Sequence, residues 1–184
     1  MDAIAMLKTD HAEVEKLFKR FEKLGPRAKK TKGDIADKVV AALSQHAVIE
    51  EQVLYPTVRE RLPDEDELVL EALEEHHVAK WLLSELHDLT PDDERFDAKF
   101  TVLAENVRHH VKEEEGELFP RLRKEFTKGE LDELGAALAA AKKVAPTKPH
   151  PRAPDEPPGN VVAAAAEAPF EIARQAVRAF AGKR

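Results

Sequence analysis

This chain has no cysteine, which excludes a disulfide framework, a thiolate zinc site and an iron–sulfur cluster. Any bound metal must therefore be held by nitrogen and oxygen ligands. The sequence also has only seven glycines and one tyrosine, and it has almost no segment with the two-residue period of a strand. With 42% hydrophobic and 35% charged residues, this composition favours an all-α protein.

No run of residues approaches the ~20 apolar positions that a membrane-spanning helix needs, so we expect no membrane span. The first ten residues carry charge too early for a secretory signal, which predicts a cytoplasmic protein. The net charge of −7 argues against nucleic acid as the main partner, because a phosphate-binding surface needs a basic patch. Lysine and arginine are scattered, apart from a short cluster at 27–32.

Apolar residues recur at the three- and four-residue steps of amphipathic helices. Glycine and proline mark the turns, and Thr90-Pro91-Asp92-Asp93 is a helix start signal. We expect helices over residues 2–24, from about 34 to 56, from about 64 to 89, from about 93 to 120 or 126, and over 127–144. Pro56 should kink or end the second helix. Short loops between the first four predict an antiparallel, up-down-up-down four-helix bundle.

One eleven-residue stretch occurs twice. It runs from His46 to Pro56 and, 64 residues later, from His110 to Pro120, with five identical positions. Each copy has a glutamate four residues after its histidine, Glu50 or Glu114, and this spacing puts both side chains on one helix face. Apolar residues share that face, so each pair points into the core. A buried carboxylate needs a partner or a metal ion, because an unpaired buried charge costs several kcal/mol.

Two more histidines lie in apolar stripes, His11 in the first helix and His76 in the third. Counting ~1.5 Å of rise per residue from each turn puts all four histidines at about the same height in the bundle. We therefore expect one layer that suits two metal ions, each held by two histidines and bridged by both glutamates. The layer consists of His11, His46, Glu50, His76, His110 and Glu114. Open coordination positions favour iron or manganese over structural zinc.

Alternatives remain open at several positions. His77 and His109 neighbour the expected ligands and replace them if a helix is rotated, and Glu115 could substitute for Glu114. Glu51, Glu113 and Glu115 are otherwise expected to be solvated, and Tyr55 and Phe119 to be packing residues. The bland alternative to a metal site is a metal-free bundle that keeps buried polar residues.

The pattern of His11, His46-x3-Glu50, His76 and His110-x3-Glu114 resembles the hemerythrin-like (HHE cation-binding) domain family over residues 1 to about 126. The resemblance implies a four-helix bundle with a non-heme di-iron centre, in which two iron ions are joined by an oxo or hydroxo bridge, with manganese as an alternative. Members of this family react with dioxygen, peroxide or NO, as oxygen carriers, sensors, iron-responsive modules or peroxide-degrading proteins.

The chain departs from the oxygen carriers of this family. They have a second histidine four residues after the third-helix ligand, where this chain has Lys80, and an aspartate five residues after the last histidine, where this chain has Glu115. Six ligands in place of seven leave an additional open position, which favours chemistry on peroxide or NO. We expect the Lys80 ammonium to stabilise an anion near this position. The function expected is catalase-like peroxide defence, and the alternative is a non-enzymatic oxygen-, NO- or iron-sensing module.

The C-terminal part is expected to be separate in character. Residues 1–126 form the bundle, and 127–144 form an additional helix that opens with the capping box Thr127-Lys-Gly-Glu130. Residues 145–184 begin with six prolines in fifteen positions, which predicts a linker. A short amphipathic helix from Pro169 to Phe180 follows, and it could bind the bundle, a partner protein or a membrane surface.

Overall fold

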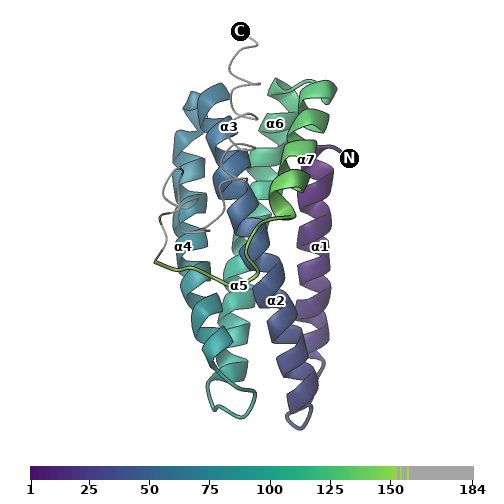
Figure 1. The fold of residues 1–184 in the computed structure, drawn as a ribbon, viewed down its shortest axis with the longest axis vertical. Helices are drawn as coiled ribbons and strands as arrows, with labels where there is room; N and C mark the ends of the chain where they lie inside the picture. Colours follow the sequence, from purple (N-terminus) through teal and green to yellow (C-terminus); the bar gives the residue numbers. More distant parts are fainter. Residues whose placement is uncertain (153, 155–156, 158–184) are drawn as a thin grey trace.

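The computed structural model describes residues 1–152, 154 and 157, and these residues form helices and turns without any strand. Four long helices run antiparallel to one another, as an up-down-up-down bundle (Figure 1). They are α1 (Ala3–Glu22), α2 (Lys29–Ile49), α4 (Asp66–Asp88) and α5 (Phe96–Glu113). The expected fold class is confirmed. The expected amphipathic helix at 169–180 lies outside the described residues.

Shorter elements extend α2 and α5 at one end of the bundle. After α2 come η1 (Glu50–Leu54), α3 (Tyr55–Arg61) and the short η2 (Pro63–Glu65), and after α5 come η3 (Glu114–Leu118) and α6 (Phe119–Glu125). The chain then turns into α7 (Lys128–Lys142), which packs beside α1 and α2 (Figure 1).

Neither Pro56 nor Pro120 ends its helix. Each follows a π-helical turn, in which the backbone N–H of Tyr55 or Phe119 donates to the carbonyl five residues earlier. A proline has no N–H and its ring collides with the carbonyl of residue i−4 in an α-helix, and a wider π turn relieves both problems locally. The same two turns begin at Glu50 and Glu114, so the doubled motif encodes a bulge as well as two side chains.

Two expected helix starts are wrong. The second helix begins at Lys29, five residues before the expected Asp34. The fourth begins at Phe96, because the Thr90 backbone N–H and hydroxyl both donate to Asp93 Oδ2 at 2.7 Å and close a separate turn. The residues of the start signal therefore do form capping hydrogen bonds, but these bonds close a turn in the loop before the helix.

The apolar core consists of two clusters. One lies toward the end that carries α3, α6 and α7 and includes Leu7, Val53 and Leu134; the other lies toward the opposite loops and includes Phe18, Leu83 and Phe100. A layer of buried polar side chains separates them, at the height of η1 and η3. Apolar packing therefore borders this layer on both sides.

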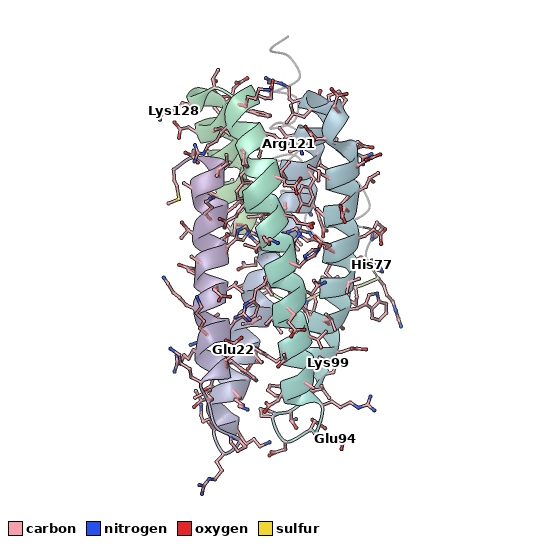
Figure 2. All side chains as sticks on the ribbon, turned by 180° about the vertical axis from the view of Figure 1, so that it is seen from behind. Glu22, His77, Glu94, Lys99, Arg121 and Lys128 are labelled. Atoms are coloured by element: carbon pink, nitrogen blue, oxygen red, sulfur yellow. The ribbon has the colours of Figure 1, made fainter. Side chains whose placement is uncertain are left out.

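Charged side chains cover the outside of the bundle, and Figure 2 shows Glu22, Lys99 and Arg121 projecting away from it. Among the described residues, no helix has the length and apolar character needed to cross a membrane.

The capping box at Thr127 is present, and α7 begins as expected. Gly135 brings this helix onto the start of the chain, since a Cβ there would lie 2.4 Å from the Met1 carbonyl oxygen and 2.8 Å from the Ala3 nitrogen. Both neighbours are backbone atoms, so the helix would have to move to make room.

Replacing Gly135 with alanine should lower the free energy of unfolding by about 1–3 kcal/mol, because the added methyl group overpacks the contact with the N-terminus. Gly129 is in the same helix with open space around it, so Gly129→Ala should be neutral or stabilising by up to about 1 kcal/mol. Urea unfolding of both variants measures the difference. Equal effects of the two substitutions would contradict this docking of α7.

Glu130 should stabilise the protein in a pH-dependent way. Hydrogen bonds from Thr127 and the ion pair with Arg61 lower the pKa of Glu130 from 4.5 to about 2. Because the folded-state pKa is lowered, this stabilisation is complete above pH 4.5 and is lost as the pH falls toward 2. We expect Glu130→Gln to cost roughly 1 kcal/mol at neutral pH and almost nothing near pH 2, by urea unfolding. A difference that stays constant over this range would contradict the assignment.

Candidate metal centre

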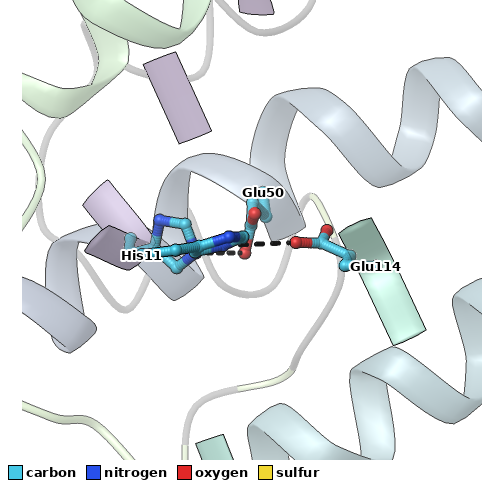
Figure 3. Close-up of side chains that lie close together, drawn as sticks. His11, Glu50 and Glu114 are labelled. Carbon is cyan, nitrogen blue, oxygen red and sulfur yellow. Dashed lines mark hydrogen bonds and ion pairs between the residues drawn. The ribbon is translucent and has the colours of Figure 1, made fainter. Parts of the chain in front are cut away.

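Six buried side chains converge in the polar layer between the two apolar clusters. They come from all four helices and both π turns, and none is more than 7% exposed. They are His11, His46, Glu50, His76, His110 and Glu114, which are the six residues expected from the sequence. Figure 3 shows the side chains of His11, Glu50 and Glu114 close together, with the Glu114 carboxylate facing the imidazole of His11. We call these six residues the cage.

The histidines of the cage form two pairs. His11 and His46 have their Nε2 atoms 3.0 Å apart, and the Nε2 atoms of His76 and His110 are 3.2 Å apart. Two nitrogens that bind one cation at about 2.1 Å lie about 3.0 Å apart at a right angle and about 3.4 Å apart in a tetrahedron. Both pairs therefore have the spacing of two ligands on one ion.

The two glutamates lie between the histidine pairs. Glu50 Oε2 is 3.2 Å from His46 Nε2 and 3.4 Å from His76 Nε2, so it reaches both pairs. Glu114 Oε2 is 3.4 Å from His11 Nε2 and 3.9 Å from His110 Nε2. In each of two overlapping groups, the potential ligand atoms lie within 4.8 Å of one another, and Glu50 belongs to both groups. The geometry suits two cations that share carboxylates.

The charge of the cage supports the same interpretation. Neither carboxylate oxygen of Glu50 has a hydrogen-bond partner among the described residues. Burial, and then the charge of Glu114, raise the pKa of Glu50 well above its ordinary value. Although burial opposes ionisation of Glu114, the hydrogen bond and charge of His11 and the charge of His110 lower its pKa to about 2. Without a cation one carboxyl group holds a proton, and a cation entering the cage would displace it.

An outer set of carboxylates orients the imidazoles. Glu115 Oε1 lies 2.9 Å from His11 Nδ1, Glu51 Oε1 lies 3.1 Å from His76 Nδ1, and Glu75 Oε2 lies 2.8 Å from His110 Nδ1. A carboxylate at Nδ1 holds the proton there and leaves the Nε2 lone pair free to bind a cation. Each of these histidines therefore presents Nε2 to the centre of the cage.

The fourth histidine has a looser partner. Asp10 Oδ2 lies 3.6 Å from His46 Nδ1 and 2.6 Å from the Nζ atom of Lys142 in α7. Burial raises the pKa of Asp10, but hydrogen bonds to His46 and Lys142 outweigh it and the pKa is lowered. Burial lowers the pKa of His46, which keeps this imidazole neutral. The additional helix α7 thus reaches the metal centre through Asp10.

This outer set was not expected from the sequence. Glu51 was expected to be solvated, but it is 2% exposed and paired with His76. The sequence does carry a signal for this set, an acidic residue beside a cage residue. The second glutamate of each motif, Glu51 or Glu115, pairs with a histidine outside the motifs. The residue directly before each of those two histidines, Glu75 or Asp10, faces a histidine of a motif.

The residues that the sequence left open as alternative ligands lie outside the cage. The side chain of His109 is 59% exposed, and His77 accepts a hydrogen bond from the Trp81 indole on the bundle surface (Figure 2). Glu115 contacts the outer nitrogen of His11 and is paired with Lys8 at 3.1 Å. Rotating a helix is therefore not needed to assemble the cage.

The sequence matches the family described as the hemerythrin HHE cation binding domain over residues 2–122. The chain belongs to the hemerythrin HHE family. The match spans all four long helices and every residue of the cage, so this is a cation-binding type of domain whose buried histidines and glutamates fit that description.

Known relatives of this HHE chain include an uncharacterized hemerythrin-like protein of Schizosaccharomyces pombe, 31% identical over 133 residues. A Nostoc protein described as a DNA nickase is 28% identical over 137 residues. The alignments cover 72% and 74% of this chain, but only 66% and 38% of the relatives' own lengths. The crystal structure of a hemerythrin HHE domain-containing protein from Mycobacterium kansasii shares the fold, with a TM-score of 0.66, 22% identity and coverage of 78% of this chain and 86% of that one.

Tyr55 adds a hydroxyl group to this HHE centre. Its oxygen lies 3.3 Å from Glu114 Oε1 and 3.4 Å from His76 Nε2. Burial, and then the charge of Glu114, raise the pKa of Tyr55 well above its ordinary value, so the hydroxyl keeps its proton. Expected only as a packing residue, Tyr55 is thus also a polar neighbour of the cage. Phe119, at the same motif position, stacks on His11 with a centroid distance of 6.0 Å.

Lys80 is buried beside His76, but its ammonium group donates to Glu51 Oε1 at 2.9 Å. That oxygen is also the partner of His76 Nδ1. Lys80 therefore holds Glu51 in place on the outer side of His76. Its expected effect on a bound anion stays a prediction.

Removing the charge of one outer carboxylate should weaken metal binding without changing the cage. We expect Glu75→Gln to lower the affinity of the metal-free protein for Co²⁺ about 10- to 100-fold, because His110 loses the group that fixes its tautomer. Competition with a chelator measures the affinity. Glu74→Gln, at the exposed neighbouring position, is the matched control. Equal affinities of the two variants would contradict this role of Glu75.

Proposed function

We propose that this protein binds two iron ions in the cage and degrades hydrogen peroxide by disproportionation. One observation carries the proposal: the carboxylate of Glu50 is completely buried between two histidine pairs and has no hydrogen-bond partner among the described residues. A carboxylate in that position is costly unless cations compensate it. Oxygen and imidazole ligands without thiolates suit iron or manganese.

The bound metal pair would supply two-electron redox chemistry, by which two molecules of H₂O₂ give two molecules of water and one of O₂. The balance needs no external reductant. The chain itself supplies the ligands, and its outer carboxylates hold the protons of the imidazoles at Nδ1. The two apolar clusters border the layer on both sides.

Tyr55 would act as a proton-holding group at the edge of the cage. Its hydroxyl group donates to Glu114 Oε1 and stays protonated because its pKa is raised. A small polar molecule in the cage would meet this O–H group as a hydrogen-bond donor. Only six protein ligands surround the two ion positions, so small molecules have room to bind.

The test is oxygen evolution from H₂O₂ by the iron-loaded protein, with metal counted in the same sample. We expect two irons per chain and one O₂ per two H₂O₂ consumed. His46→Ala should lower turnover by at least about tenfold, because it removes one ligand. His87→Ala, at an exposed position near the end of α4, should leave it unchanged.

Equal turnover in both histidine variants would contradict the proposal. Absence of oxygen evolution from protein with two irons would do so as well. If dioxygen or NO then gives a reversible spectral change, the alternative of a non-enzymatic sensing or binding module is the correct one. In that case removing residues 145–184 should abolish partner binding and leave the metal content unchanged.

A further inference from the structure

A cavity of about 460 Å³ adjoins the cage on the side of the apolar cluster that contains Phe18 and Leu83. All four cage histidines line one end of it. The walls are mainly apolar and come from α1, α2, α4 and α5, including Val14, Leu43, Ala79 and Val107. The cavity is thus a mainly apolar compartment with the candidate metal centre at one end.

The compartment is far larger than the oxidants considered above require. An apolar cavity of about 150 Å³ is enough to bind benzene. Along α1 the lining extends from His11 to Phe18, which is seven residues or about 10 Å. A slim organic molecule fits this length and volume, and pockets of this size are typical of small-ligand sites.

The cavity reaches the surface beside the second motif. Lys112 and Gly116 line it and are both exposed. Gly116 has open space around its Cα, whereas the matching residue of the first motif, Gln52, is buried and 1% exposed. The first motif lies under α7, which packs against η1. The two motifs therefore differ at this position in the described part of the chain.

Ion pairs connect α1 and α5 across this face. Arg108 donates to Glu15 at 2.9 Å and to Glu22 at 2.8 Å, and its guanidinium lies 5.5 Å from the centre of the Phe18 ring. The side chains of Arg108 and Glu15 are each about one third exposed. Partly exposed pairs of this kind contribute little to stability.

The charges that line the cavity indicate the type of ligand. Lys80 is paired with Glu51, and Arg108 is paired with Glu15 and Glu22. A ligand with an anionic head would have to compete with these carboxylates, whereas a neutral polar head would not. An apolar wall, a polar end at the cage and the paired charges of Lys80 and Arg108 suit a neutral molecule with an aliphatic body.

We infer that the cavity binds an aliphatic hydroperoxide, with its hydrocarbon body along the apolar walls and its O–OH end at the cage. The choice of a hydroperoxide rests on the proposed peroxide chemistry, while the apolar body rests on the cavity alone. Hydrogen peroxide and an organic hydroperoxide would reach the cage through the same opening.

The test uses 1-alkanols as unreactive analogues, measured by calorimetry on the iron-loaded protein and on the metal-free protein. Affinity should rise about fourfold per added methylene, the change that follows from about 0.8 kcal/mol per buried CH₂. It should stop rising once the body exceeds the cavity's length of about 10 Å. Affinity that is absent or independent of chain length would overturn the inference.

Substitutions in the cavity wall test whether the alkanol binds in this cavity. Ala79→Phe fills the cavity from α4 and should lower 1-octanol affinity at least tenfold, whereas Val78→Phe, at the adjacent exposed position, should not. Gly116→Phe narrows the opening at a position where a side chain has room to fit, so it should slow the association of 1-octanol, and Gly129→Phe is its control. If Ala79→Phe does not fold, the association rates of the Gly116 and Gly129 variants decide. Equal affinity of the folded Ala79 and Val78 variants, or equal association rates of the two glycine variants, would overturn the inference.

These measurements separate this inference from the proposed function. Chain-length-dependent alkanol binding without peroxide turnover would leave the cavity assignment standing and refute the proposed chemistry. Turnover of H₂O₂ without alkanol binding would refute the cavity assignment alone. Iron-loaded protein that binds alkanols with chain-length-dependent affinity and disproportionates H₂O₂, with 1-octanol as a competitive inhibitor of that turnover, would support both.

Discussion

The burial of two carboxylates among four imidazoles is the constraint on which this structure depends. Glu50 and Glu114 lie in a layer with apolar clusters on both sides, where an uncompensated charge is costly. Several features serve this layer: four helices bring the histidines to one height, two π turns begin at the two glutamates, and outer carboxylates set the imidazole tautomers. Two cations would complete the charge balance.

The doubled motif gives the cage an approximate two-fold symmetry, and the rest of the chain breaks it. On one side α7 covers the first motif, with Gly135 against the N-terminus and Lys142 bound to Asp10. On the other side Gly116 takes the place of the buried Gln52, and a cavity reaches the surface there. The two copies of the eleven-residue motif thus lie in different surroundings, one under α7 and one beside the cavity that all four cage histidines line.

The six cage residues followed from the sequence because helix spacing and loop length determine which residues share a face and a height. The outer partners did not follow, because Glu51 and Glu75 contact histidines of other helices, and such contacts depend on how each helix is rotated. The π turns and the start of α5 were missed because each signal has two local solutions. Pro56 fits after a π turn as well as at a helix end, and Thr90 closes a separate turn with Asp93 instead of capping the helix.

The most direct test of the central claim is a crystal structure of the iron-loaded protein, with diffraction data at the iron absorption edge. Two anomalous peaks should lie in the cage, one about 2.1 Å from the Nε2 atoms of His11 and His46 and the other equally close to those of His76 and His110. Both glutamate carboxylates should contact both ions. A single peak, or iron bound only outside these six residues, would contradict the account.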